Sequence, residues 1–210
     1  MLRSIRLERI PVKDTFATTL PFGQIGEGYI ATWLRGRGWN VLPVYEKEID
    51  NGKGPRLFMA KSSGPTQLIA PDMLALKDGK FMWVEAKRKT RFSWYGKGGY
   101  WVTGIDKRHY DDYCAVFKTT KIQLWIMFLH SESHTWPEDV RKWHAPETCP
   151  VGLFGNTIDC LMNTASHVSH NYGTSGMIYW NISALRALAP LAAIMPQPTL
   201  KNTLQLNTTY

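Results

Sequence analysis

Apolar and polar positions in the middle of the chain form a pattern that predicts a β-hairpin. Two runs, Met73 to Leu76 and Phe81 to Val84, are apolar on both faces, and Asp78-Gly79 lies between them. An Asp-Gly pair favours the type I′ turn of a two-residue hairpin, since both central residues of that turn need positive φ. Strands that are apolar on both faces are typical of the centre of a sheet covered by helices.

This turn also sets which residues of the two strands face each other. It places Leu74 opposite Trp83 and, further along the same face, Asp72 opposite Glu85, with Cβ atoms about 5 Å apart. Lys87 points to that same face, because side chains alternate along a strand. Ionised side chains are rarely buried unless they are paired or bind a metal. The pattern therefore indicates either a structural ion pair or a site for a divalent cation beside a phosphate.

A helix and a strand are expected before the hairpin. The helix runs from Phe22 to about Arg35, and glycines close it. Glu27 lies at helical spacing from the apolar residues of this segment, so its carboxylate shares their face; an exposed position on the helix flank is the alternative. The strand runs from Asn40 to Tyr45.

Further elements are expected after the hairpin. Thr103 and Asp106 have the spacing of a capping box, which predicts a helix from Ile105 to about Lys118. Residues 121–129 are strongly apolar and predict another central strand. A last strand near residues 177–182 could extend the same sheet.

In this order of elements, Pro71-Asp72 and Glu85-Ala86-Lys87 resemble the PD-(D/E)XK nuclease superfamily. Its restriction-endonuclease-like fold also includes Holliday-junction resolvases. The resemblance covers about residues 20 to 130 and implies an α/β fold with a central mixed β-sheet flanked by helices.

The resemblance also assigns roles. It implies that Asp72 and Glu85 bind Mg²⁺, with Mn²⁺ as a substitute, and that Ala86 lends its carbonyl oxygen. It implies that Lys87 orients or activates the attacking water, and that Glu27 supplies a further acid from the first helix. The expected catalytic side chains are those of Asp72, Glu85, Lys87 and Glu27.

The expected activity is Mg²⁺-dependent hydrolysis of DNA phosphodiester bonds by an endonuclease. Whether the substrate is a branched junction or another form of DNA is left open. Resolvases of this superfamily commonly act as dimers, so a homodimer is an option that the resemblance adds. The alternative is a nuclease-like fold that binds nucleic acid without catalysis.

Length, charge and cysteine content limit the domain organisation, the compartment and the class of partner that we expect. The chain has 210 residues, which fits a single domain with its core at about 20–130 and near 177–182, and a loop-rich C-terminal insertion at about 131–175. No apolar run reaches the roughly 18 residues of a membrane span. Three cysteines favour a reducing, cytoplasmic compartment. The formal net charge of +8 favours a polyanionic partner such as DNA.

Basic and aromatic residues follow the second strand of the hairpin and continue to the start of the next helix. Lysine and arginine can neutralise phosphates, and aromatic rings can stack on unpaired bases. Glycines in this segment would let it close over a substrate as a loop. The alternative is a surface loop whose aromatic side chains pack on the domain. The expected DNA contacts are Lys89, Arg91, Trp94, Lys97, Lys107 and Arg108.

Histidines and cysteines in the region from 131 to 175 raise the question of zinc. Their spacing matches no strong zinc template, because no Cys-x-x-Cys pair is present. Structural zinc is therefore not expected, and core or free thiols with surface histidines are the preferred interpretation. The residues concerned are His144, Cys149, Cys160, His167 and His170.

Overall fold

The computed structural model of the protein describes residues 15–44, 56–59, 66–172 and 175–195. Its main sheet has six strands in the order β1-β4-β5-β8-β9-β12. β5 and β8 run parallel, and the other neighbouring strands run antiparallel, so the sheet is mixed as expected. The strands are β1 (Asn40–Pro43), β4 (Met73–Lys77), β5 (Lys80–Lys89), β8 (Gln123–His130), β9 (Gly152–Thr157) and β12 (Arg186–Ala189).

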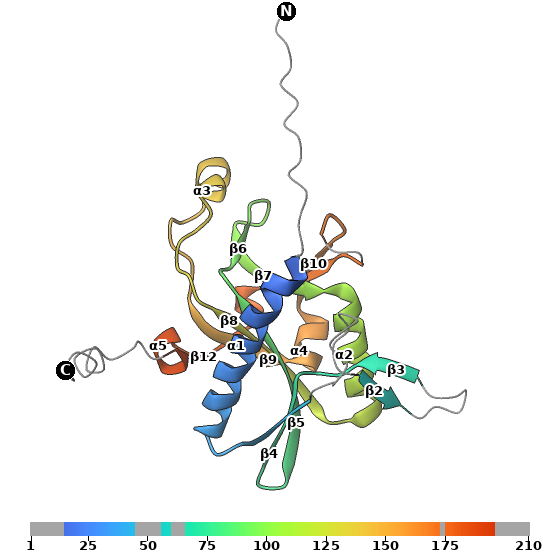
Figure 1. Ribbon diagram of the computed structural model, residues 1–210. Helices are drawn as coiled ribbons and strands as arrows, with labels where there is room; N and C mark the ends of the chain where they lie inside the picture. The colour runs from blue at the N-terminus through green and yellow to red at the C-terminus, as the bar shows by residue number, and fades with distance from the viewer. Residues whose placement is uncertain (1–14, 45–55, 60–65, 173–174, 196–210) are drawn as a thin grey trace, which may run out of the picture.

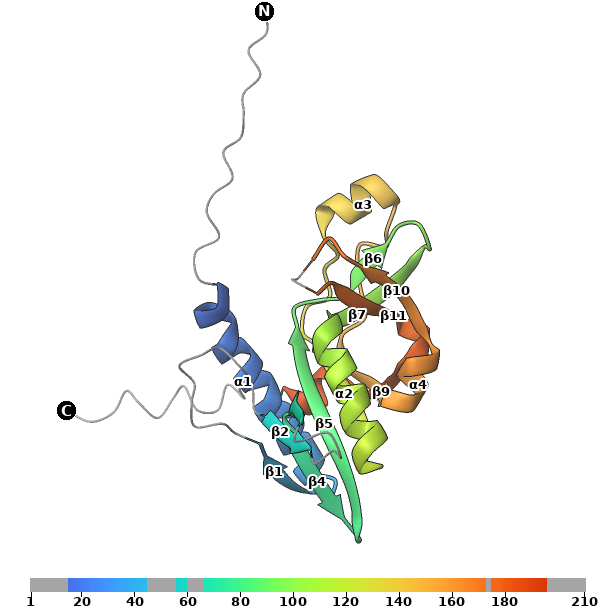
Figure 2. The same cartoon turned by 90° about the vertical axis from the view of Figure 1, so that its right-hand side faces the viewer.

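Helices cover both faces of this sheet (Figures 1 and 2). On one face, α1 (Thr15–Arg35) and α5 (Leu191–Ile194) pack on a buried cluster that includes Ile30, Leu34 and Val84. On the other face lie α2 (Lys107–Thr120) and α4 (Ile158–Asn163). The order helix, strand, hairpin, helix, strand along the chain is the one expected from the sequence, and the predicted fold class is confirmed.

A second sheet lies beside α2 and α4. Its order is β10-β11-β7-β6, and all its pairs are antiparallel. These strands are β6 (Ser93–Tyr95), β7 (Tyr100–Asp106), β10 (Ala165–Ser169) and β11 (Met177–Asn181). A separate hairpin consists of β2 (Arg56–Met59) and β3 (Thr66–Ile69). The remaining short elements are α3 (Pro137–Trp143) and the 3₁₀ turn η2 (Ile182–Ala184).

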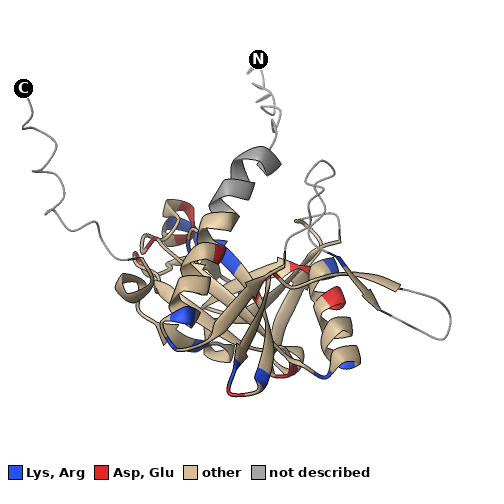
Figure 3. Cartoon of the chain, turned by 60° about the horizontal axis from the view of Figure 1, so that its bottom comes forward, with Lys and Arg blue, Asp and Glu red and all other residues tan. Residues whose placement is uncertain are grey.

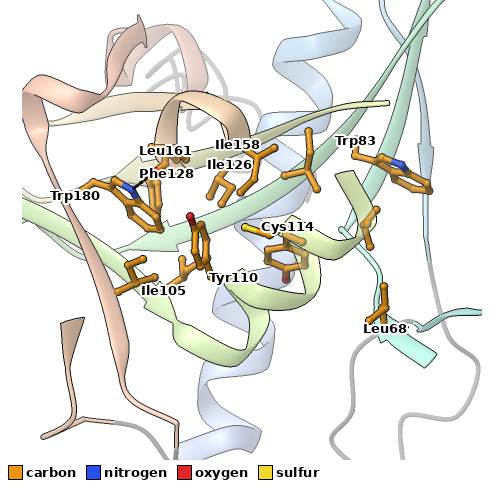
Figure 4. Close-up of a cluster of buried hydrophobic side chains, with 14 residues drawn as sticks. Leu68, Trp83, Ile105, Tyr110, Cys114, Ile126, Phe128, Ile158, Leu161 and Trp180 are labelled. Atoms are coloured by element: carbon orange, nitrogen blue, oxygen red, sulfur yellow. Dashed lines mark hydrogen bonds between the residues drawn. The ribbon is translucent and has the colours of Figure 1, made fainter. Parts of the chain in front are cut away.

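The largest buried cluster joins the two sheets. Ile126 and Phe128 of β8 contribute to it from the main sheet, and Trp180 of β11 contributes from the second sheet (Figure 4). Trp180 is fully buried, and its indole Nε1 donates to the carbonyl oxygen of Leu161 in α4 over 2.9 Å. A buried indole N–H with a partner costs little, so this tryptophan can fill the space between α4 and the second sheet.

Three expectations about the elements are wrong. Residues 103–106 are no capping box: Thr103 is buried inside β7, and the cap of α2 is Asp106, whose Oδ1 accepts from the Arg108 N–H over 2.9 Å. The strand expected near 177–182 exists as β11, but it belongs to the second sheet. The segment after Lys89 was expected to be a loop that closes over a substrate, and it forms the β6–β7 hairpin instead.

The region from 131 to 175 also differs from the expected loop-rich insertion. β9 lies within it and joins the main sheet beside β8, so this region supplies part of the core. The expected end of the first strand at Tyr45 lies outside the described residues. None of the described helices combines the length and the apolar character needed to cross a membrane.

Candidate functional site

The hairpin β4–β5 has the register that its turn predicts. Asp78 and Gly79 have φ values of 49° and 71°, as a type I′ turn requires. Leu74 faces Trp83, and Met73 faces Val84 at the end of the ladder. The next residue back along the chain is Asp72, so the turn chemistry alone carries this aspartate to the side of β5.

Asp72 is held at both its backbone and its side chain. Its carbonyl oxygen accepts from the Val44 N–H over 2.8 Å, which ties it to the end of β1. Its Oδ2 accepts from the Ala86 N–H, also over 2.8 Å. The carboxylate is therefore fixed against β5 where the β4 ladder has ended.

The carbonyl of Ala86 points to the same side as its N–H group. Within an extended strand, the N–H and C=O of one residue point toward the same neighbouring strand. Because the Ala86 N–H meets Asp72, its carbonyl oxygen also faces the edge that β4 leaves open. Asp72 and the Ala86 carbonyl thus present oxygen atoms to one place.

Glu85 and Lys87 complete this place from β5. The Glu85 side chain is fully buried, and its Oε1 forms an ion pair with Nζ of Lys87. No hydrogen bond of good geometry joins its Oε2 to another described residue, although the hydroxyl of Tyr113 on α2 faces the same carboxylate. A buried carboxylate oxygen without a bonded partner is unfavourable, so the site is incomplete as a purely structural ion pair.

α1 reaches the site because a glycine lets it approach β5. A Cβ at Gly26 would lie 2.5 Å from Cβ of Arg88, so only glycine permits this packing distance. The neighbouring residue, Glu27, is half-buried and interacts electrostatically with Lys87 and Glu85. The helix thus brings a further acid to the edge of the site.

The charges at the site act on one another. Burial raises the pKa of Asp72 well above its usual value; Glu85 and Glu27 raise it further, while Lys87 and the Ala86 N–H oppose them. Burial also raises the pKa of Glu27, with Lys87 opposing and Glu85 adding to the rise. Together with Glu85, the ionised forms of these acids would carry more negative charge than one ammonium neutralises, and the raised pKa values of Asp72 and Glu27 show that this surplus is unfavourable.

The pKa of Lys87 is also raised, and for an amine this favours the charged form. Burial alone would lower its pKa, but the carboxylates of Glu85 and Asp72 outweigh burial and hold the pKa above its usual value. The ammonium is therefore protonated throughout the neutral pH range. Lys87 can place positive charge beside a substrate, and it cannot accept a proton from water while these acids surround it.

One residue of the site was not singled out from the sequence. Burial raises the pKa of Tyr113 well above its usual value, and the charges of Glu85 and Asp72 raise it further. Its place on the buried face of α2 follows from helical spacing, because Tyr110 and Val116 are buried on the same face. The sequence shows that face, but only the packing of α2 on β5 shows which acid Tyr113 meets.

Two of the residues expected to contact DNA have structural roles. Arg91 donates to the carbonyl oxygen of His134 over 2.8 Å, pairs with Glu132 and lies 4.1 Å from the ring centre of Trp136. Trp94 packs edge-on against Trp101 with ring centres 4.8 Å apart. Both side chains take part in the packing around β6, and their contact with DNA stays a prediction.

The other four expected contacts are distributed over the molecule. Lys97 and Arg108 are exposed, at the β6–β7 turn and at the start of α2. Lys107 pairs with Asp111 over 2.6 Å. Lys89 lies at the end of β5, beyond Lys87. Basic positions occur on several elements rather than on one helix (Figure 3).

The residues considered for zinc do not come together. Cys149 is buried and donates to the carbonyl oxygen of Glu132. His167 is stacked between the rings of Tyr95 and Tyr179. Across the described part of the chain, no three His, Cys, Asp or Glu side chains are grouped closely enough to hold a metal ion by themselves.

A site with fewer side-chain ligands still suits one class of cation. Mg²⁺ keeps several waters and is commonly bound by one or two carboxylates together with phosphate oxygens of the substrate. Asp72, Glu85 and the Ala86 carbonyl supply hard oxygen atoms of this kind, and Oε2 of Glu85 is buried without a sound hydrogen bond. The residues present therefore fit Mg²⁺ or Mn²⁺ and do not fit zinc.

Comparison with known proteins gives likenesses of fold only. No protein-family model matches the chain, and no curated protein matches it significantly. One similar solved structure is Hjc, a Holliday junction resolvase of Archaeoglobus fulgidus, with 8% identity, a TM-score of 0.42, and coverage of 77% of this chain and 90% of the other. Another is a nuclease from a fusselovirus, with 12% identity, a TM-score of 0.33, and coverage of 80% and 86%.

Proposed function

We propose that the protein is a Mg²⁺-dependent nuclease that hydrolyses DNA phosphodiester bonds. The observation that carries this proposal is the hydrogen bond from the Ala86 N–H to Oδ2 of Asp72. It fixes one carboxylate beside a second, buried carboxylate, that of Glu85, which has an ion pair on only one oxygen. A surplus of buried negative charge at a strand end is the environment that a divalent cation stabilises.

Asp72, Glu85 and the carbonyl of Ala86 would hold the cation, and Glu27 would support a second position. A bound Mg²⁺ lowers the pKa of its water and neutralises charge that develops on the attacked phosphate. The chain itself supplies the rest. Asp72 and Glu85 would position the phosphate group by holding the cation that it binds, and the N–H groups of Ala86 and Val44 hold Asp72 in place before substrate arrives.

Lys87 would stabilise the transition state by charge. Its protonated Nζ is paired with Oε1 of Glu85 and retains partial exposure, at 28% of the side chain. It can therefore turn from the carboxylate toward a phosphate oxygen as negative charge builds up there. The proton of the attacking water must leave to another acceptor, such as a neighbouring phosphate oxygen or bulk water.

DNA is the substrate that the charge of the chain favours. A formal net charge of +8 attracts polyanions over long range and speeds their association. An endonuclease reaction at an internal bond is the form that we propose, and resolvase-like cleavage of branched DNA is one version of it. A binding module without catalysis would share the charge, but it would have no use for an under-neutralised pair of buried acids.

A substrate panel tests this proposal. Supercoiled, linear and four-way branched DNA are incubated with the protein and Mg²⁺, and each reaction is repeated with EDTA. The proposal expects cleavage of at least one form in Mg²⁺ and none in EDTA. Binding to all three without cleavage of any of them would favour the non-catalytic module.

A further inference from the structure

Lys89 is the third residue of a row on one face of β5. Side chains alternate along a strand, so Glu85, Lys87 and Lys89 point to the same side. That side also carries Phe128 and His130 of β8, which are the parallel partners of Lys87 and Lys89. The row thus continues directly from the proposed catalytic site to the end of the strand.

Lys89 differs from Lys87 in having no counter-ion. Lys87 pairs with Glu85, whereas no carboxylate among the described residues bonds to Lys89 or contributes to its electrostatics. The pKa of Lys89 is lowered to about 8, first by burial and then by the charge of Lys87. A largely buried amine beside a second ammonium is costly, and such cost is typically retained at binding sites.

The described neighbours of Lys89 offer it no negative charge. Its partner across the strands, His130, is fully buried, and the His130 ring is stacked on Phe92 with ring centres 3.7 Å apart. Burial, followed by the charge of Lys89, lowers the pKa of His130 to about 3, so this histidine is neutral at pH 7. Phe92 and His130 therefore form an uncharged wall beside the amine.

We propose that Lys89 binds the phosphate adjacent to the one that is cleaved, so that the substrate of this site is a chain with at least two consecutive phosphates. This inference rests on the proposed function, since it takes Lys87 to mark the cleaved phosphate. Residues two apart on a strand are separated by about 6.7 Å along it. Consecutive phosphates of a polynucleotide, with one sugar between them, have a similar separation, so a chain lying along β5 would place one phosphate at each amine.

The spacing selects a class of substrate. A single phosphodiester or a mononucleotide would bind at Lys87 and would leave Lys89 without a partner. A bond inside a polynucleotide would use both amines. The subsite therefore favours internal bonds, because the flanking phosphate supplies the counter-ion that none of the described residues provides.

Short thymidine ligands test this proposal without cleavage. The affinity of TpT, which has one phosphate, is compared with that of TpTpT, which has two, by NMR titration in EDTA at low salt. The parent protein should bind TpTpT about tenfold more tightly, as expected for one additional charge-assisted contact. Lys89→Gln should lose this preference, and Lys89→Arg should keep it.

Lys80→Gln is the matched control, because Lys80 is an exposed lysine at the opposite end of β5. This variant should retain the tenfold preference. A TpTpT analogue with one neutral methylphosphonate tests the contact from the ligand side, so the result does not depend on the folding of any variant. The parent should bind the analogue with the flanking position neutralised no more tightly than TpT.

Equal preference for TpTpT in the parent and in Lys89→Gln would overturn the subsite. That result is distinguishable from failure of the proposed function, which is decided by cleavage in Mg²⁺. A protein that cleaves DNA but shows no Lys89-dependent preference has the activity without the subsite. A protein that keeps the preference and never cleaves has the phosphate subsite without the activity.

Discussion

The N–H of Ala86 donates to Oδ2 of Asp72 over 2.8 Å, and this bond sets the geometry of the whole site. Asp72 precedes β4, and Ala86 lies in β5 two residues beyond Val84, the last residue that pairs with β4. The hydrogen bond extends the hairpin by one side chain, so it places a carboxylate where a backbone carbonyl would otherwise continue the ladder. Glu85 and Lys87 flank Ala86 and are thereby brought to the same acid.

Replacement of Asp72 by asparagine should stabilise the fold while it removes cleavage. The amide oxygen can still accept from Ala86, and the charge that burial and Glu85 disfavour is gone. Thermal unfolding at pH 7 without metal should show a melting temperature raised by about 2–4 °C, which corresponds to roughly 1 kcal/mol. An unchanged or lower melting temperature would mean that the ionised carboxylate of Asp72 does not destabilise the fold.

The pH dependence of this stabilisation has a defined sign. Asp72 has a raised pKa in the folded state, so the folded protein binds more protons than the unfolded chain above pH of about 4. The parent therefore loses stability as pH rises through this window, and Asp72→Asn, which keeps only the contribution of Glu27, loses less. The two melting temperatures should converge near pH 4 and separate toward neutral pH.

Binding of Mg²⁺ should release protons. Burial raises the pKa of both Asp72 and Glu27, and a cation can bind only their ionised forms. The apparent affinity should therefore increase as pH rises from 5 to 8, by up to about tenfold per pH unit for each proton released. Calorimetry in buffers of different ionisation enthalpy measures the proton count, and an affinity independent of pH and buffer would contradict it.

Two glycines of α1 provide a matched test of how Glu27 reaches the site. Gly26→Ala puts a Cβ 2.5 Å from Cβ of Arg88 and should push α1 away from β5, at a cost of about 1–3 kcal/mol. Gly28→Ala meets nothing within 4 Å and should stabilise the helix by about 0.8–1 kcal/mol. Urea unfolding compares the two variants with the parent.

The same two variants also distinguish an effect on the position of Glu27 from an effect on the stability of the fold. If α1 positions Glu27, Gly26→Ala should also weaken Mg²⁺ binding, and Gly28→Ala should leave it unchanged. Equal Mg²⁺ affinity in both variants would show that Glu27 has no part in holding the cation.

The hairpin could be predicted from sequence because local chemistry decides it. Asp78-Gly79 allows only one common turn, and the turn fixes the register of every pair as far as Met73 and Val84. Binary patterning then identified β5 and β8 as central strands. Predictions of this kind depend on neighbours in the chain, and they were confirmed.

The errors lie where distant segments decide the structure. The capping-box spacing of Thr103 and Asp106 predicted the start of a helix at Ile105, with Gly104 between them. In the structure Gly104 is inside β7, where a Cβ would lie 2.4 Å from the carbonyl oxygen of Ile178 in β11. The close approach of these two strands requires the glycine, and the local sequence does not predict that β7 and β11 pair. The lack of a counter-ion for Lys89 among the described residues is a similar case. It depends on which residues the fold brings next to Lys89, and the local sequence does not show this.

The most direct test of the account is the single-turnover rate of DNA cleavage in Mg²⁺ by the parent and by Glu85→Gln. Lys80→Gln, at the far end of the same strand, serves as the control. Loss of one metal-binding carboxylate should reduce the rate by about a thousandfold, since it removes several kcal/mol of transition-state stabilisation. The control should cleave within about twofold of the parent. A Glu85→Gln protein that cleaves as fast as the parent would contradict the assignment of this strand end as the catalytic site.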